Sequence, residues 1–197
     1  MKYDLSKKPT KGAQRTLKAF SVTMLQLVSE FPFEEVNVNQ ICQASNYPRA
    51  TFYNYFNDKY DLLEYCWYLL GQQIDLSQHT HFASDQLLFI YFDRIYSFLF
   101  NQRPWLEKTV ANNAINGSLV LSFIDYLKKQ TREIFYTQIE SEVTDQTLSL
   151  PLELLADHYS NTLLLVLEWI FFKQNPTDKE TSHYYLRQLL GRQSFQF

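Results

Sequence analysis

The chain has few of the residues that interrupt helices or build covalent cross-links. Its 197 residues include four glycines, six prolines and two cysteines. This scarcity of helix breakers favours long helices, and so few glycines argue against the glycine-rich loop that cradles phosphates in nucleotide-binding enzymes. Cys42 and Cys66 lie in apolar helical patterns without metal-ligand spacing. A disulfide framework is therefore unsupported, and we expect reduced thiols and a cytoplasmic location.

The sequence also lacks a secretory signal and a membrane-spanning run. Residues 1–18 are polar and basic, without the apolar stretch of a signal peptide. The most apolar run, residues 163–172, contains Glu168 and is far shorter than the ~20 residues of a membrane helix. We therefore expect no membrane association, and interpret this run as a buried or interfacial helix.

Net charge is small, but its distribution is uneven. The whole chain carries −3 at neutral pH, whereas residues 1–60 carry +3 and residues 61–197 carry −6. A basic end on an acidic body suits phosphate binding by the first segment alone. The basic N-terminal residues either follow a DNA backbone or form a solvated tail. These residues are Lys7, Lys8, Lys11 and Arg15.

The spacing of apolar residues predicts an all-α fold. Apolar residues recur every three or four positions from Leu17 to Phe31, which predicts an amphipathic helix that Pro32 ends. Two short helices follow, with a longer helix beginning after Asn57 or Asp58 as its N-cap. The short helices span about 39–45 and 48–56, a loop about 77–83, and further helices about 84–102, 104–115, 118–143, 151–174 and 178–192.

Two short helices separated by a three-residue turn, after a longer helix, form a helix-turn-helix pattern. We therefore predict two domains, a DNA-binding domain at 1–60 and a larger helical domain at 61–197. In the second short helix, Phe52 and Phe56 share an inward face, and Arg49 can reach a guanine edge or a phosphate. The polar side chains that can contact DNA beside Arg49 are Thr51, Tyr53, Asn54 and Tyr55.

The segment from Asn37 to Leu62 resembles the head of the TetR family of transcriptional regulators. The most specific part of the match is Thr51-Phe52-Tyr53-Asn54-Tyr55-Phe56, followed by Lys59 and Leu62. The resemblance implies a homodimer that places two recognition helices in successive major grooves of double-stranded DNA, with Tyr53 and Lys59 as phosphate contacts. It also implies that the helical domain at 61–197 binds an effector and supplies the dimer surface. The DNA-binding residues predicted in this way are Asn39, Gln40, Tyr47, Pro48, Arg49, Ala50, Thr51, Tyr53, Asn54, Tyr55 and Lys59.

Three positions depart from the family pattern. Asn46 stands where the family usually has glycine, Pro48 where it has a capping serine or threonine, and Ala50 where glycine is common. Asn46 preserves the chemistry of the turn because asparagine tolerates the left-handed conformation. Pro48 removes a hydroxyl that would cap the helix or contact the backbone. Loss of DNA binding is therefore one alternative interpretation of the head.

The body gives less specific signals. Aromatic residues are dense between residues 82 and 105, and they either line an effector pocket or pack as an ordinary core. Of the two helices at 151–192, the first (151–174) is apolar nearly all round, which favours a homodimer interface through this pair over a monomeric core. The residues proposed to line the pocket are Trp67, Phe89, Phe92, Tyr96 and Trp105.

No pattern supports an enzyme, a metal site or a cofactor. His79 and His81 alternate in a polar loop with Asp85 nearby, which is a weak metal-site pattern. Cys66 has no basic neighbour that would activate it as a nucleophile. We therefore interpret the chain as a dimeric repressor released by an effector. The alternative is a helical interaction module, or an activator controlled by a partner protein.

Overall fold

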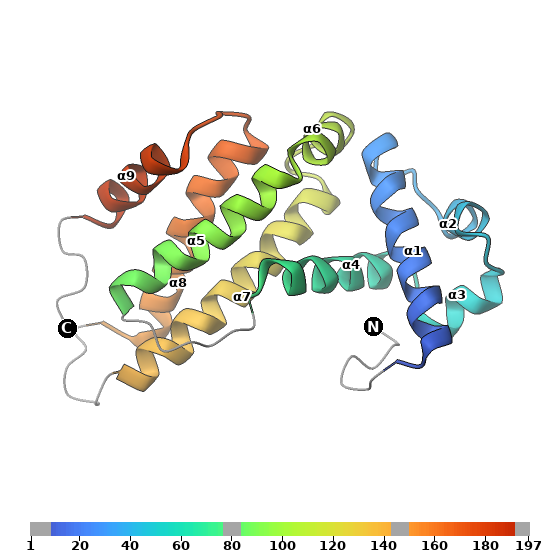
Figure 1. Cartoon of the computed structure of the whole chain (residues 1–197), viewed down its shortest axis with the longest axis horizontal. Helices are drawn as coiled ribbons and strands as arrows, with labels where there is room; N and C mark the ends of the chain where they lie inside the picture. Colours follow the sequence, from blue (N-terminus) through green and yellow to red (C-terminus); the bar gives the residue numbers. More distant parts are fainter. Residues whose placement is uncertain (1–8, 77–83, 143–149, 192–197) are drawn as a thin grey trace. The chain divides into compact units, whose positions relative to one another are not determined.

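The computed structural model describes residues 9–76, 84–142 and 150–191, and every regular element in these ranges is helical (Figure 1). The all-α prediction is thus confirmed. The loop predicted at 77–83 lies outside the described residues. The helices are α1 (Lys11–Glu30), α2 (Val38–Ser45), α3 (Arg49–Tyr55), α4 (Lys59–Ile74), α5 (Ser84–Asn101), α6 (Arg103–Asn112), α7 (Ser118–Glu142), α8 (Leu152–Leu167), η1 (Glu168–Phe172) and α9 (Lys179–Leu190).

The chain divides into two compact units, and neither is one continuous segment. The first unit comprises Met1–Leu70 and Pro104–Ser122, and the second comprises Gly71–Arg103 and Phe123–Phe197. Residues 104–122 of α6 and early α7 are therefore grouped with α1, α2 and α3. The functional boundary at residue 60 stays a prediction.

In the first unit, α1 supplies an apolar stripe to the core. Thr10 caps its start by accepting a hydrogen bond from the Ala13 N–H at 3.2 Å. The buried side chains on α1 recur at three- and four-residue spacing, which places them on one face of the helix. α2 and α3 lie on one side of α1 (Figure 1). The buried apolar residues of this stripe are Leu17, Phe20, Met24 and Val28.

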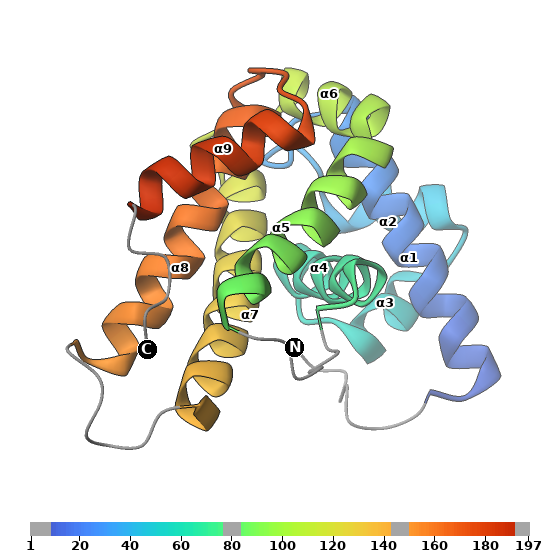
Figure 2. The same ribbon diagram turned by 60° about the vertical axis from the view of Figure 1, so that its left-hand side comes forward.

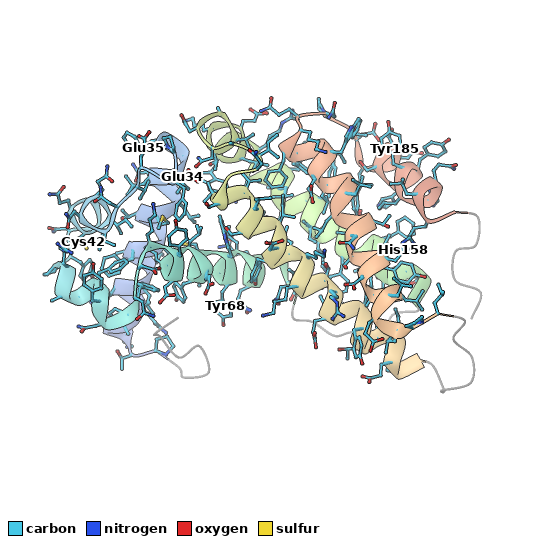
Figure 3. The ribbon with its side chains drawn as sticks, turned by 180° about the vertical axis from the view of Figure 1, so that it is seen from behind. Glu34, Glu35, Cys42, Tyr68, His158 and Tyr185 are labelled. Carbon is cyan, nitrogen blue, oxygen red and sulfur yellow. The ribbon has the colours of Figure 1, made fainter. Side chains whose placement is uncertain are left out.

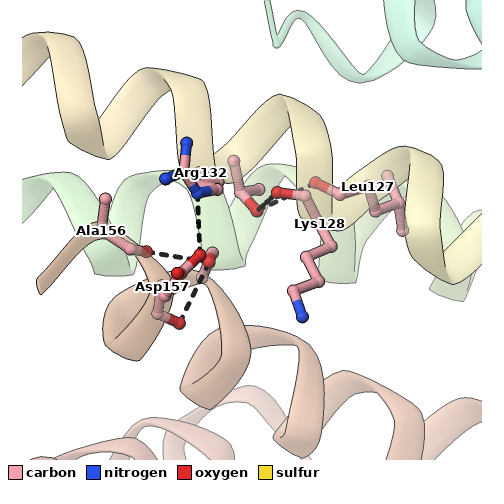
Figure 4. Close-up of polar contacts among 7 residues, drawn as sticks. Leu127, Lys128, Arg132, Ala156 and Asp157 are labelled. Carbon is pink, nitrogen blue, oxygen red and sulfur yellow. Dashed lines mark hydrogen bonds and ion pairs between the residues drawn. The ribbon is translucent and has the colours of Figure 1, made fainter. Parts of the chain in front are cut away.

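In the second unit, α5, α7 and α8 lie alongside one another and α9 packs on α5 and α8 (Figure 2). The Phe135 and Tyr159 rings meet between α7 and α8. Beside them, Arg132 Nε donates to Asp157 Oδ1 at 2.8 Å (Figure 4). Both partners are about one-third exposed or more, so this pair orients the two helices but contributes little net stability.

The last turn of α8 widens into a π turn, η1, which the sequence did not predict. The apolar pattern predicts one helix over 151–174. It does not reveal the π turn, because a single wide turn leaves the three- and four-residue spacing nearly intact. In η1 the Phe172 side chain is buried with its ring 6.2 Å from that of Phe123, whereas Trp169 stays 39% exposed. Burial is the main influence that raises the pKa of the Glu168 carboxyl. The π turn therefore separates one inward aromatic residue from one outward one.

Candidate DNA-binding surface

The turn between α2 and α3 is built from three local features. Asn37 caps α2 in a reciprocal capping box, in which its side chain accepts from the Gln40 N–H and Gln40 Oε1 accepts from the Asn37 N–H. Asn46 ends α2 in the left-handed conformation, with φ 58° and ψ 40°. Pro48 precedes α3 and offers no side-chain cap. The turn chemistry expected of Asn46 is thus present.

Aromatic side chains fix the inner face of α3. Phe52 and Phe56 are both 0% exposed, and the Phe52 ring lies 5.4 Å from the Phe20 ring of α1 in an edge-to-face contact. Such contacts are worth more than the area they bury, because the ring edge meets the electron-rich face. One side of α3 is therefore anchored on α1, and the opposite side points away from the core.

The outer face of α3 carries the residues predicted to contact DNA. Arg49 Nη2 lies 3.3 Å from the Tyr53 hydroxyl, and its guanidinium lies 5.7 Å from the centre of the Tyr53 ring. The pair holds a cation and a phenol together on the surface. Pro48, Arg49, Ala50, Tyr53 and Asn54 are exposed, whereas Thr51 and Tyr55 are half-buried.

The residues predicted before α3 divide between surface and structure. Asn39 is exposed. Gln40 is half-buried and serves the capping box through its side-chain oxygen. Tyr47 is half-buried, with its ring 5.4 Å from that of Phe20. The structure thus gives Gln40 and Tyr47 contacts that shape the motif, in addition to the DNA contacts proposed for them.

Lys59 at the start of α4 directs its ammonium at backbone carbonyls. Its Nζ donates to the carbonyl oxygens of Phe33 at 2.7 Å, Glu34 at 3.0 Å and Val36 at 2.8 Å. The same nitrogen lies 4.5 Å from the centre of the Phe33 ring. Burial is the main influence on this group and lowers the pKa of Lys59. Three donors meet three acceptors, which is the full capacity of an ammonium group.

A second set of contacts comes from the C-terminal end of α6, where Asn112 is the last helical residue and Asn113 follows it. The side chains of Asn112 and Asn113 donate to the carbonyls of Ser29 and Val28, at 2.9 and 2.8 Å. The Asn113 Oδ1 accepts from the Phe33 N–H at 2.8 Å. Carbonyls in the last turn of a helix have no partner within the helix, so these amides cap the end of α1. The sequence does not reveal these two asparagine caps, because no short motif marks a partner 80 or more residues away.

The five residues predicted to line an effector pocket do not all belong to one unit. Trp67 and Trp105 lie in the first unit, whereas Phe89, Phe92 and Tyr96 lie in the second. The Trp105 indole N–H donates to the Leu25 carbonyl of α1 at 2.9 Å. Trp67 and Phe92 are buried, and Phe89 packs against the His183 ring of α9.

Of these five residues, only Tyr96 lines the open cavity described in the second unit. The cavity has a volume of about 670 Å³ and mixes aromatic and charged groups, including Lys179 and Arg103. Lys179 Nζ already approaches the Ser97 hydroxyl at 3.1 Å. The lining residues are Tyr96, Ser97, Phe100, Asn101, Arg103, Pro176, Thr177, Asp178 and Lys179.

A second hollow in this unit is almost entirely apolar. It has a volume of about 420 Å³ and lies on the outer faces of α8, η1 and α9. The Trp169 and Tyr185 rings meet edge to face at 5.7 Å, and Tyr185 is seen on α9 in Figure 3. We call this hollow the α8–α9 groove, and its residues are Leu165, Val166, Trp169, Tyr185, Gln188 and Leu189.

The described residues offer little support for metal or thiol chemistry. Within residues 9–76, 84–142 and 150–191 no three histidine, cysteine or acidic residues gather as metal ligands, and His79 and His81 lie outside these ranges. Cys42 of α2 (Figure 3) and Cys66 are free, buried thiols. Burial raises the pKa of Cys66 to about 12, so its thiol stays protonated and unreactive. In the same part of the chain, no helix combines the length and hydrophobicity needed to cross a membrane.

The candidate DNA-binding surface lies within a segment that is similar to a known family of regulators. Residues 24–66 match the family model described as bacterial regulatory proteins, tetR family. This segment spans α2, the turn and α3, together with the end of α1 and the first half of α4. No curated protein matches the chain by sequence.

Solved structures of TetR-family and related regulators have the same fold. A TetR-family regulator from Streptomyces coelicolor superposes with a TM-score of 0.64 at 15% identity, covering 93% of this chain and 97% of that one. The fatty acid degradation regulator FadR from Bacillus halodurans gives 0.62 at 19% identity, covering 95% and 98%. FadR from Bacillus subtilis, solved with stearoyl-CoA, gives 0.60 at 16% identity, covering 88% and 97%. At such identities the likeness establishes the fold.

Proposed function

Because this chain is a transcriptional regulator of the TetR family, we propose that α3 binds the major groove of a specific DNA sequence. The observation that carries the proposal is the division of α3 into two faces. Phe52 and Phe56 anchor it on the core, while Arg49 and Tyr53 are held together on the outside. An exposed arginine at the start of a short helix can donate two hydrogen bonds to a guanine edge or pair with a phosphate.

The full chain is tested by selecting duplex DNA from a random-sequence pool and measuring affinity at two salt concentrations. Arg49→Ala is expected to weaken binding to the selected duplex by about 5- to 150-fold, the range for losing one good base contact. If Arg49 contacts a phosphate instead, the negative slope of log affinity against log salt should become smaller in magnitude by about 0.9 in Arg49→Ala.

Lys108→Ala is the matched control, because Lys108 is an exposed cation on α6. Equal affinity of wild type and Arg49→Ala would remove α3 from the interface. If wild-type protein selects no duplex at all, the DNA-binding proposal itself fails, and the helical interaction module becomes the better account.

We infer that the protein acts as a homodimer through the α8–α9 groove. Leu165, Trp169 and Leu189 lie in it, each between 39% and 50% exposed. A contiguous apolar surface of this kind is covered in most soluble proteins. A second copy of the same groove, related by a two-fold axis, would cover it with like residues.

We further infer a cytoplasmic repressor that a small molecule releases from DNA. The second unit holds a cavity of about 670 Å³ with aromatic walls, two cations and the Asp178 carboxylate. Because the cations outnumber the carboxylate, the cavity suits a ligand with an apolar part and an anionic group. The stearoyl-CoA bound by FadR from Bacillus subtilis makes long-chain acyl-CoA the first class to test. Release requires that the ligand bind the DNA-free conformation more tightly.

Long-chain acyl-CoA is expected to displace the protein from its selected duplex and to raise the melting temperature of the free protein. Lys179→Ala is expected to weaken that response, because Lys179 lines the cavity. Coenzyme A without the acyl chain is the control ligand. A ligand that strengthens DNA binding would contradict release by the ligand, and transcription that rises when the protein binds DNA would make the chain an activator instead.

A further inference from the structure

The helix-turn-helix segment is closed at its base by a single side chain. Val36 lies just before the Asn37 cap of α2, and Lys59 opens α4 just after α3. The hydrogen bond from Lys59 Nζ to the Val36 carbonyl therefore joins the two ends of the segment that carries α2 and α3. The bonds to the Phe33 and Glu34 carbonyls extend this closure into the turn that follows α1.

The same turn is also held by Asn113, which directly follows α6. Asn113 is 3% exposed and all of its described hydrogen bonds are internal. Its Oδ1 accepts from the Phe33 N–H, and its Nδ2 donates to the Val28 carbonyl. Both backbone polar groups of Phe33 are thus hydrogen-bonded by side chains. Its N–H donates to Asn113, and its carbonyl accepts from Lys59. Figure 3 shows neighbouring Glu34 on this turn.

We propose that Lys59 and Asn113 are positioning residues for DNA binding, which fix residues 33–36 and thereby the placement of α2 and α3 on α1. The inference rests on the proposed DNA-binding function. It assigns the Lys59 ammonium to the base of the motif, where three carbonyls occupy its three donors. The resemblance to the TetR family assigns the same residue to a DNA phosphate, so the two roles can be separated experimentally.

Two substitutions of Lys59 distinguish these roles. Three carbonyl oxygens converge on one nitrogen, a geometry that an ammonium meets and a planar guanidinium does not. We therefore expect both Lys59→Arg and Lys59→Met to bind the selected duplex about tenfold more weakly or worse, with the salt slope unchanged. A phosphate contact predicts a different result. Lys59→Arg would then retain affinity, and Lys59→Met would reduce the magnitude of the salt slope by about 0.9. Lys108→Met controls for loss of a cation.

Asn113 supplies an independent readout in the absence of DNA. Asn113→Leu removes the acceptor of the Phe33 N–H, so hydrogen exchange at Phe33 should accelerate and affinity for the selected duplex should fall about tenfold. Asn112→Leu is the matched control, because Asn112 is an exposed neighbour that caps Ser29 without touching Phe33. Circular dichroism and exchange in α5 and α8 verify that the variants are folded.

The outcomes separate the inference from the function on which it rests. If the wild-type protein selects no duplex, both the DNA-binding function and the positioning role of Lys59 and Asn113 are contradicted. A wild-type protein that binds while the Lys59 and Asn113 variants bind equally well overturns only the positioning role. Faster exchange at Phe33 without loss of affinity has the same meaning, because the turn would then be loosened without consequence for α3. Lys59 is half-buried rather than buried, so its variants keep the test decisive if Asn113→Leu does not fold.

Discussion

Phe52→Ala is expected to lower the free energy of unfolding by about 3–5 kcal/mol, the usual cost of truncating a buried phenylalanine. The Phe52 ring is fully buried and meets the rings of Phe20 and Phe56, at 5.4 and 5.5 Å. Its loss leaves a cavity between α1 and α3, and the short helix α3 cannot easily shift to close it. Urea unfolding followed by circular dichroism measures the change, and DNA affinity should fall with it because α3 loses its anchor.

The neighbouring residue provides the control. Tyr53 lies one position later on the same helix and is 37% exposed, so Tyr53→Ala should change stability much less while still weakening DNA binding. The two variants therefore distinguish the packing of α3 on the core, which depends on Phe52, from contact with DNA, which is proposed for Tyr53. Equal stability of Phe52→Ala and Tyr53→Ala would contradict the packing of α3 on α1.

Leu165→Glu is expected to convert a dimer into a monomer. Under the proposed two-fold arrangement, each protomer would bring a carboxylate into an apolar contact, where an unpaired charge is costly. The mass in solution, measured by light scattering, should then fall from twice 23.5 kDa to 23.5 kDa. Affinity for a two-half-site duplex should fall about a hundredfold or more, because linked binding of two heads is lost.

Leu121→Glu is the matched control, since Leu121 is 46% exposed against 48% for Leu165 but lies on early α7, outside the α8–α9 groove. It should leave the mass unchanged. A wild-type protein that is already a monomer at micromolar concentration would refute the dimer proposal, and a dimeric Leu165→Glu would move the interface elsewhere on the chain.

The parts of the fold that depend on neighbours in sequence could be predicted. Pro32 marks the end of α1, and Asp58 caps α4 by accepting from the N–H groups of Tyr60 and Asp61. The inward face of α3 follows from the four-residue spacing of Phe52 and Phe56. These signals are local because helix periodicity and capping act within a few residues.

Contacts between distant segments could not be predicted in this way. The density of aromatics around Trp105 predicts an effector pocket, but it does not reveal the hydrogen bond from the Trp105 indole N–H to the Leu25 carbonyl of α1. Composition shows that an aromatic residue will be buried but not which helix will bury it. Lys59 was likewise assigned from the family pattern, which fixes its position in the motif and not the partner that its ammonium meets.

The return of the chain to its first unit at Pro104 limits how the protein can be recombined. A chimera that fuses only residues 1–70 to the body of another regulator would leave the caps of α1 behind, since Asn112 and Asn113 lie at the C-terminal end of α6 and directly after it. The graft would carry every residue of α3 and still lose part of the frame that holds it. Transplanting the head with its specificity intact therefore requires two segments of sequence, the second ending near residue 122.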